Sequence, residues 1–215
     1  MKVFLIGYGT IASALMPNLL SEFEREIKFL KVIDPHGIKK LSADFNCPVI
    51  WVAASVTKGN LENLLSEMDS DSFLINLSVD VSNVDLVSFC QKKGSKYIDT
   101  CIEPWAGYYV NPDTEPADRT NYALRETMLA LKAECQNGPT AIVAHGANPG
   151  LVSHFAKQAL LNIRDDIYGI SQPTPQTRQQ WAKLSADLGV KTIHIAEHDT
   201  QVAKLPKRPG EFVNT

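Results

Sequence analysis

Residues 3–12 constrain the fold of this chain more than any other stretch. The first four are apolar, as in a short buried strand, and a helical pattern begins at Thr10. Between strand and helix lie Gly7 and Gly9, and the small residue Ala12 follows three positions after the second glycine. This Gly-x-Gly-x-x-Ala spacing is typical of a strand that turns sharply into a helix beside a bound phosphate.

Each small residue of this motif has a physical role. Gly7 allows the sharp turn, and Gly9 lacks a Cβ, so that the backbone can approach a pyrophosphate closely. Ala12 lets the helix pack tightly on the strand. The helix start also supplies free N–H groups and a partial positive charge, which favour phosphate. The motif therefore predicts a dinucleotide-binding turn.

The next predicted strand, residues 29–33, ends in Asp34. Its distance from the glycine motif suits a carboxylate that binds a ribose hydroxyl. Because a carboxylate there would repel a 2′-phosphate, we expect NAD rather than NADP as the cofactor. The alternative is a glycine-rich turn without a ligand, in which Asp34 caps a helix.

Composition limits the other classes of function. The 215 residues, 44% of them hydrophobic, give room for one domain and part of another. With a net charge of −3 and no Lys/Arg cluster, no nucleic-acid partner is expected. No apolar run reaches the ~18 residues of a membrane span, so no membrane partner is expected either. An Ala-x-Ala stretch near the start resembles a signal-peptide cleavage site, but its residues belong to the strand–helix pattern.

The four cysteines lie far apart and form no Cys-x-x-Cys pair. We therefore expect neither a zinc site nor a disulfide framework, and a reducing, cytoplasmic location. The stretch from His194 to His198 matches a His-x-x-Glu-His zinc motif. That motif needs a helix, whereas residues 190–196 alternate like a strand. No metal is expected.

Strands and helices alternate along most of the chain. This pattern predicts an α/β fold, a doubly wound parallel sheet of the Rossmann-type NAD-binding class. The expected strands are residues 3–6, 29–33, 49–52, 73–77, 96–100 and 140–144. The expected helices are residues 10–24, 60–68, 82–93, 119–136, 151–162 and 176–188. We assign residues 1–150 to the dinucleotide-binding domain and residues 151–215 to an incomplete second α+β substrate domain.

Loops that follow parallel strands meet at one edge of the sheet, so four of them predict a common site. They are residues 7–12, 77–80, 100–109 and 145–150. The cofactor-binding residues expected in this part of the chain are Gly7, Gly9, Thr10, Ile11, Asp34, Ser78, Thr100, Ala147 and Asn148.

The third of these loops carries Glu103 beside Trp105. A carboxylate next to an indole suits a cationic amine, which both charge and the ring face attract. The alternative is a glutamate that faces solvent. In the fourth loop, Asn148 is placed to hydrogen-bond nicotinamide or substrate, unless it serves only as a turn residue before Pro149.

With these residues identified, the sequence resembles the bacterial homospermidine synthases, within the broader saccharopine dehydrogenase-like group. The matching stretches are Gly7–Ile11, Tyr97–Trp105, Asp118–Glu126, His145–His154 and Ile195–Gln201. The first is common to many enzymes, whereas the middle three are far more specific. Together the matches cover essentially the whole chain.

The resemblance implies an aminobutyl transferase of polyamine biosynthesis that uses NAD as a recycled cofactor. Putrescine, or a similar diamine, gives a hydride to NAD⁺ and becomes an imine; ammonia leaves as a second putrescine adds, and the hydride returns. The resemblance assigns catalytic roles to Glu103, Asn148 and Glu197, with Trp105 as a further substrate contact. It also implies a homodimer for the full-length form.

The chains of that family are much longer, and just past the match at residues 212–215 they carry a tryptophan that packs on the amine. This sequence stops before that position, so we expect it to be a fragment. Three other hypotheses remain: an NAD-dependent dehydrogenase of the saccharopine group, an NAD-binding module without activity, and a redox or nucleotide sensor that acts through a partner, for which the sequence offers no motif.

Overall fold

The computed structural model describes residues 1–37, 41, 44–169, 173–198, 206 and 208–210. The chain divides into two compact units, Met1–Ser153 and His154–Thr215. No helix in the described ranges is both long enough and apolar enough to cross a membrane.

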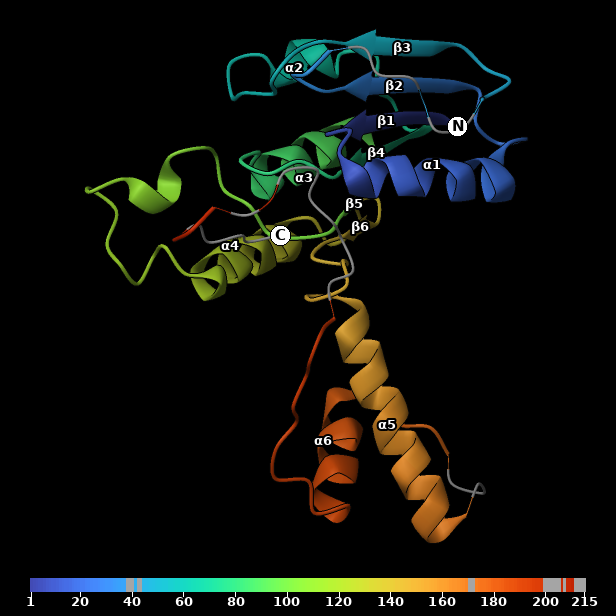
Figure 1. Ribbon diagram of the computed structural model, residues 1–215, viewed down its shortest axis with the longest axis vertical. Helices are drawn as coiled ribbons and strands as arrows, with labels where there is room; N and C mark the ends of the chain where they lie inside the picture. The colour runs from blue at the N-terminus through green and yellow to red at the C-terminus, as the bar shows by residue number, and fades with distance from the viewer. Residues whose placement is uncertain (38–40, 42–43, 170–172, 199–205, 207, 211–215) are drawn as a thin grey trace. The chain divides into compact units, whose positions relative to one another are not determined.

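The first unit is built on a six-stranded parallel sheet, as the alternation of strands and helices predicted (Figure 1). The strand order is β3-β2-β1-β4-β5-β6. The first three strands are added outward from β1 toward one edge of the sheet. The chain then returns to the middle, where β4 pairs with β1, and the last strands are added toward the other edge. This order is that of a Rossmann fold. The strands are β1 (Lys2–Ile6), β2 (Phe29–Ile33), β3 (Val49–Val52), β4 (Ser72–Asn76), β5 (Lys96–Asp99) and β6 (Ala141–Ile142).

The central strand β1 is buried on both faces. Its side chains alternate, so that Phe4 and Ile6 pack in one core and Val3 and Leu5 in the other. Each of these four side chains is at most 2% exposed. Burying an apolar side chain of this size stabilises the fold by about 1.5–3 kcal/mol. The continuous apolar run at the start of the chain thus specifies an interior strand.

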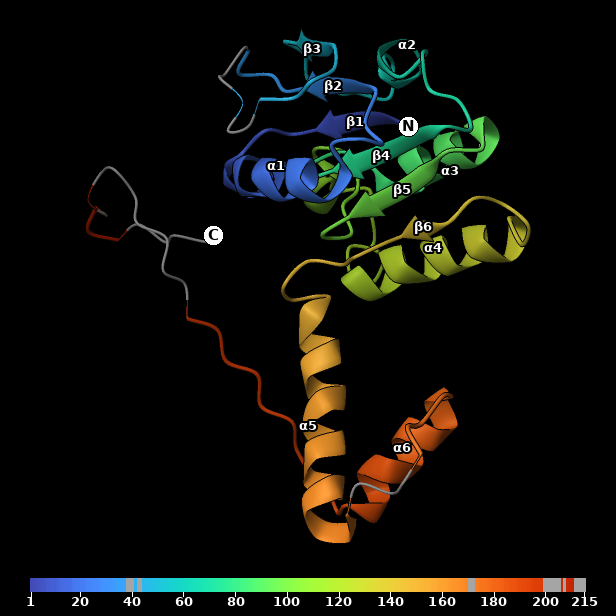
Figure 2. The same cartoon turned by 90° about the vertical axis from the view of Figure 1, so that its right-hand side faces the viewer.

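Helices cover the two faces unequally. The core around Phe4 is completed by side chains of α2 (Leu61–Leu64), α3 (Asn83–Lys93) and α4 (Asn121–Glu134). The opposite core is completed by α1 (Thr10–Phe23), through Ala12, Met16 and Leu19. Figure 2 shows α1 on one side of the sheet and α3 on the other.

Helix α2 is shorter than the predicted 60–68. After Leu64 the chain tightens into turns in which the N–H of Ser66 bonds Asn63 O and that of Met68 bonds Leu65 O. The apolar residues of the predicted helix still reach the core, since Leu65 and Met68 are buried. Periodicity therefore found the buried face correctly but not the end of the helix.

The second unit contains most of α5 (Leu151–Tyr168) and all of α6 (Arg178–Asp187). Helix α6 begins at a capping box formed by Thr177 and Gln180. The ammonium of Lys157 lies 5.3 Å from the ring centroid of Trp181, which joins the two helices. Helix α5 extends six residues beyond the predicted end at Asn162.

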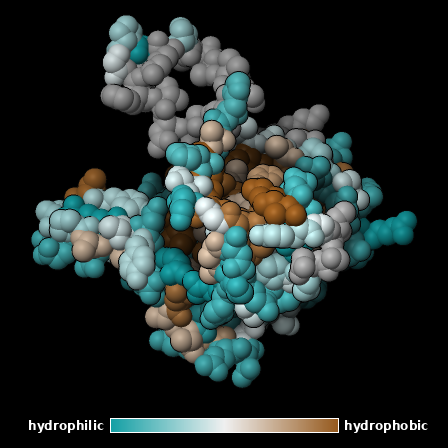
Figure 3. Space-filling model, turned by 90° about the horizontal axis from the view of Figure 1, so that it is seen from below, coloured by the Kyte–Doolittle hydropathy of each residue, from teal (hydrophilic) through white to brown (hydrophobic). Residues whose placement is uncertain are grey.

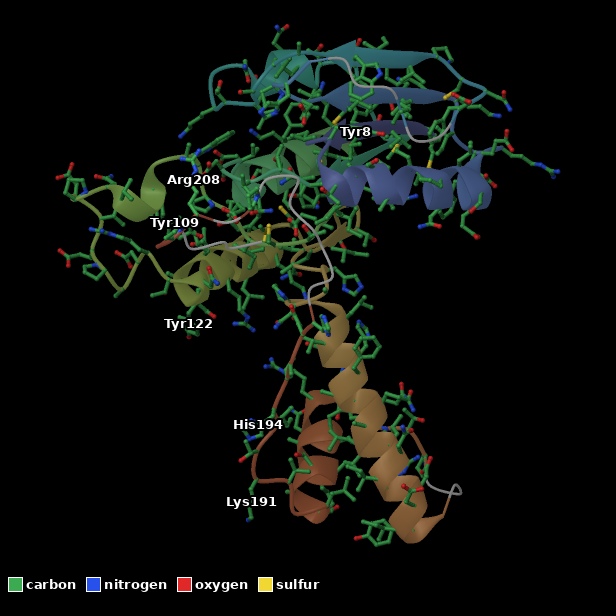
Figure 4. All side chains as sticks on the ribbon, viewed as in Figure 1. Tyr8, Tyr109, Tyr122, Lys191, His194 and Arg208 are labelled. Atoms are coloured by element: carbon green, nitrogen blue, oxygen red, sulfur yellow. The ribbon has the colours of Figure 1, made fainter. Side chains whose placement is uncertain are left out.

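The predicted strand at residues 190–196 is wrong. This stretch is irregular and exposed, and Figure 4 shows Lys191 and His194 along it, after α6. Alternating β-branched residues form a strand only where a neighbouring strand can pair with them, and none of the described residues pairs with this stretch. The histidines of the His-x-x-Glu-His stretch are therefore not on a helix either.

Several large apolar side chains of the second unit remain exposed, among them Phe155, Ile163, Ile167 and Tyr168 of α5. The space-filling view shows hydrophobic side chains exposed among hydrophilic ones (Figure 3).

Candidate functional site

A cavity of about 590 Å³ opens at the carboxyl ends of β1, β2 and β4. Its lining includes Gly7, Gly9, Asp34 and Ser78, four of the residues predicted to bind a cofactor. The volume lies within the range of ligand-binding clefts. The structure therefore brings together the glycine turn, the carboxylate after β2 and the loop after β4.

The two glycines of the turn meet different requirements. Gly7 has a φ of +85°, and a Cβ on it would lie 2.9 Å from backbone atoms of Leu77 and Ser78. Any larger residue would therefore push β1 and β4 apart. A Cβ on Gly9 would meet no atom within 4 Å, so that glycine borders open space. Gly7 is needed by the fold, and Gly9 leaves room beside the helix.

Helix α1 begins at this open space without a side-chain cap. Gly9 is its N-cap residue, and the first turn holds no acidic side chain. Its first N–H groups and its positive dipole end are thus suited to an anion such as a phosphate. Thr10 and Ile11 are exposed on this first turn and do not line the cavity wall.

Asp34 is a buried carboxylate, 5% exposed, fixed by backbone groups. Its Oδ2 accepts the N–H of Tyr8 at 2.7 Å, and its Oδ1 accepts the N–H of His36 at 2.9 Å. Figure 4 shows Tyr8 between β1 and the start of α1. The glycine turn and the end of β2 are thereby tied together, and a fixed negative charge lies in the cavity wall. Such a charge attracts hydroxyl donors and repels phosphate.

Ser78 follows β4 and half-buries its side chain in the same cavity. Its hydroxyl donates to Asn76 Oδ1 at 2.6 Å, and its backbone N–H reaches the same oxygen at 3.2 Å. The hydroxyl oxygen keeps its capacity to accept a hydrogen bond from a ligand.

A group of acidic and polar side chains surrounds Glu103. Its carboxylate accepts hydrogen bonds from the Cys101 thiol and from the backbone N–H of Asp80. Burial raises the pKa of Glu103, and the negative charge of Asp80 raises it further. Burial also raises the pKa of Tyr109, and Glu103 adds to that shift. Tyr109 lies on the loop that carries the short helix η1 (Tyr108–Val110; Figure 4).

No lysine, arginine or histidine of the described residues forms an ion pair with Glu103 or Asp80. Two neighbouring carboxylates without a cation attract a positively charged ligand, because a cation would offset both the burial and the mutual repulsion. Asp80 also lines the cavity that holds Gly7 and Asp34, so the acidic group and the cavity are adjacent.

Trp105 lies against α2 and α3. Its indole N–H donates to Asp85 Oδ2 at 2.5 Å, and its ring borders a smaller cavity together with Leu61 and Phe89. It does not line the cavity that holds Asp34. The acceptor Asp85 lies three residues after Ser82, the N-cap of α3, and nothing in the sequence indicated its contact with Trp105.

The loop that follows β6 lies against the end of β5. A Cβ on Gly146 would be 2.7 Å from the carbonyl oxygen of Thr100, so two of the predicted loops are in close contact. Thr100 is half-buried, whereas Ala147 and Asn148 are exposed. The peptide bond from Asn148 to Pro149 is cis.

Glu197 lies in the second unit, on the irregular stretch after α6, and its side chain is exposed. Asp199, a second acidic residue two positions after Glu197, falls outside the described residues, as does the end of the match at Gln201. Across the described ranges, no three His, Cys, Asp or Glu side chains are grouped so that they could hold a metal.

Sequence reasoning missed the polar side chains beneath this site. Asn83, Tyr97 and Asp99 are at most 1% exposed and hydrogen-bonded to one another. Tyr97 and Asp99 stand two residues apart on β5, so they point to the same face, and this spacing was the only available signal.

The sheet order, the glycine turn and the carboxylate after β2 define a dinucleotide-binding domain of the Rossmann class. A family model described as the saccharopine dehydrogenase NADP binding domain matches residues 3–142. The chain belongs to this family.

The chain is also similar in sequence to individual proteins along almost its whole length. The chain is 43% identical over 217 residues to a homospermidine synthase of Blastochloris viridis, and 41% identical over 218 residues to one of Mesorhizobium japonicum. Each alignment covers 99% of this chain and 45% of the relative. The chain thus spans less than half the length of the curated relatives it matches.

A crystal structure of a homospermidine synthase from Legionella pneumophila in complex with NAD has a similar fold. The TM-score is 0.80 at 39% sequence identity, and the match covers 97% of this chain and 43% of that one. The resemblance found in the sequence motifs is confirmed by these comparisons.

Proposed function

We propose that this chain contains the NAD-binding domain of a homospermidine synthase, which transfers an aminobutyl group from one putrescine to another. Three of its relatives carry that name, and one was solved with NAD. The observation that carries the proposal is Asp34, a carboxylate fixed at the end of β2 beside an open glycine turn.

The residues of the cavity fit NAD. The open space at Gly9 and the uncapped start of α1 suit a pyrophosphate. Asp34 suits the hydroxyls of a ribose, since both its oxygens accept hydrogen bonds and it carries negative charge. That charge favours NAD over NADP, although the family model is described by NADP binding.

Bound NAD supplies a hydride acceptor that can return the hydride later, so the net reaction is a transfer rather than an oxidation. The chain's own contribution is to bind a dicationic amine. Glu103 and Asp80 offer neighbouring carboxylates, and partial burial of Glu103 strengthens its attraction for an ammonium. Putrescine carries an ammonium at each end, so a second acidic contact is needed along its length.

The remaining predicted residues complete the proposal. Trp105, Asn148 and Glu197 are proposed substrate contacts, Asn148 lying between substrate and nicotinamide, and Thr10, Ile11, Thr100 and Ala147 are proposed cofactor contacts. Residues 151–215 are proposed as the start of a substrate and dimerisation domain. A homodimer in the full-length form and a cytoplasmic location belong to the same proposal.

The test has two parts. Calorimetry with NAD and NADP should give the tighter binding for NAD, and equal or stronger NADP binding would contradict the role of Asp34. Incubation of the chain with NAD⁺ and putrescine should then yield homospermidine and ammonia without accumulation of NADH. The family model favours a second candidate, a dehydrogenase of the saccharopine group, and steady accumulation of NADH would support it. NAD binding without any product would indicate a binding module.

A further inference from the structure

Two loops that carry proposed substrate contacts are joined by a buried hydrogen-bond network. The network consists of Asn83 at the start of α3 and Tyr97 and Asp99 on β5. Asn83 is 0% exposed, and the other two side chains are each 1% exposed. Buried polar groups are costly unless they are fully hydrogen-bonded, so the contacts of these three residues need an explanation.

Asn83 holds the main chain of Glu103 from both sides. Its backbone N–H donates to Glu103 O at 3.1 Å, and its Oδ1 accepts the N–H of Glu103. Its Nδ2 also donates to Cys101 O at 3.0 Å. These bonds fix the peptide groups on both sides of the Glu103 side chain, and therefore the direction in which that carboxylate leaves the loop.

Asp99 holds the loop after β6 in the same way. Its Oδ1 accepts the N–H of Ala144 at 2.6 Å, and its backbone carbonyl accepts the N–H of His145 at 3.0 Å. Ala144 has a φ of +57°, a left-handed conformation that alanine rarely adopts. The bond to a buried carboxylate stabilises that conformation. Because Ala144 is where the loop toward Asn148 begins, this conformation sets the direction in which the loop leaves β6.

The two halves meet at the Asp99 side chain. Its Oδ2 accepts a hydrogen bond from Asn83 Nδ2, and the hydroxyl of Tyr97 donates to the same carboxylate. The Tyr97 oxygen in turn lies 3.1 Å from Asn83 Nδ2. None of the described residues forms an ion pair with Asp99, so the hydrogen-bond donors alone compensate its burial.

We propose that Asn83 and Asp99 are positioning residues, which hold the Glu103 loop and the 144–150 loop in the one arrangement that binds the amine. This role rests on the proposed function. The inference goes beyond the proposed function because it gives Asn83 and Asp99, which contact neither substrate nor cofactor, an indirect part in amine binding.

The pair allows a test by exchange of its members. Asp99→Asn sets two amide NH₂ groups against each other, and Asn83→Asp sets two carboxylates against each other. The double exchange N83D/D99N restores a donor on one side and an acceptor on the other. It also keeps an oxygen for the N–H of Glu103 and one for the N–H of Ala144. It loses the donors to Cys101 O and to the Tyr97 oxygen but keeps the contacts to the two loop amides, so we expect most of the function to return.

The affinities for two ligands distinguish a positioning role from a general loss of structure. Putrescine affinity should fall roughly ten- to hundredfold in each single variant and recover in the exchange. ADP-ribose, which lacks nicotinamide, should bind the Gly7–Asp34 cavity as in the parent chain. Ser95→Ala is the matched control, because Ser95 is buried at the other end of β5 and donates to Asp69 O. It should lower stability without changing either affinity.

Amide hydrogen exchange gives a measurement that needs no ligand. The N–H groups of Glu103 and Ala144 should be protected in the parent chain, exposed in the single variants and protected again in the exchange. Should the single variants fail to fold, Tyr97→Phe removes one donor to Asp99 and should weaken putrescine about threefold.

Three results would overturn the inference: equal loss of both ligands, no recovery in the exchange, or unprotected amides in the parent chain. The last would leave the proposed function intact. Protected amides in a parent chain that binds no putrescine would instead contradict the proposed function, and the positioning role with it.

Discussion

The nucleotide cavity is built differently from the neighbouring amine loops, that is, the Glu103 loop and the 144–150 loop that we propose to bind the amine. The cavity depends on backbone: a left-handed glycine, an uncapped helix start and a carboxylate held by two main-chain N–H groups. The amine loops depend on buried side chains that come from α3 and β5. A motif of adjacent residues can therefore specify the first region, whereas the second needs residues that are distant along the chain.

The largest effect is expected for Gly7→Ala, which tests whether the cavity depends on the backbone. The new Cβ would meet the backbone of Leu77 and Ser78 at 2.9 Å, in a backbone conformation that alanine disfavours. We expect a loss of about 3 kcal/mol in the free energy of unfolding, measured with denaturant, and loss of NAD binding.

Gly9→Ala is its matched control. Its Cβ meets no protein atom, so stability should change by less than about 1 kcal/mol, while NAD affinity falls because the ligand needs that space. If both variants lost stability equally, the division of roles between the two glycines would be wrong.

Asp34→Asn tests the one side chain on which the cavity depends. Loss of the charge should weaken NAD roughly tenfold or more and reduce the preference for NAD over NADP, as measured by calorimetry. Putrescine binding should stay unchanged. An unaltered ratio of NAD to NADP affinity would show that Asp34 does not face the ribose.

Glu103→Gln tests the amine loops alone. The amide keeps the shape of the side chain but not its charge, so putrescine affinity should fall about tenfold while NAD affinity is kept. Equal putrescine affinity in the two proteins would remove Glu103 from the site.

The same variant gives a pH dependence with a defined sign. Because burial raises the pKa of Glu103, the folded chain binds its proton more tightly than the unfolded chain does. Ionised Glu103 therefore lowers stability at neutral pH. This cost disappears as the pH falls below the unfolded pKa, near 4.5. Unfolding curves should show Glu103→Gln as the more stable protein at pH 7 and no difference in acid.

The smallest effects are expected at Trp105. Trp105→Phe removes the bond to Asp85 but keeps a ring, so stability should fall by about 1 kcal/mol with little change in putrescine affinity. Trp105→Leu also removes the ring face and should weaken putrescine about threefold. An unchanged affinity in the leucine variant would show that the indole serves packing alone.

The sequence predicted the nucleotide cavity better than the loops beside it, for the same reason. The six strands, the glycine turn and Asp34 were predictable, because apolar runs and local spacing mark them directly. Residues 190–196 were predicted as a strand from their alternation, but a strand also requires a partner, which a local pattern cannot show.

The network beneath the amine loops could not be predicted for a related reason. Asn83 looked like an ordinary first residue of a helix, and Asp99 like the polar end of a strand. Their contacts span 16 residues between themselves and 45 residues to Ala144. No periodicity records a hydrogen bond over such a separation, so only the folded structure reveals it.

The contact between Gly7 and the backbone at Leu77 and Ser78 has a consequence for how this domain can diverge. The gap between the two strands that carry the cofactor loops is set by main-chain atoms touching main-chain atoms. Replacement of either neighbouring side chain leaves that gap unaltered. The loop after β4 can therefore accumulate substitutions and acquire new chemistry while the platform beneath it keeps its dimensions.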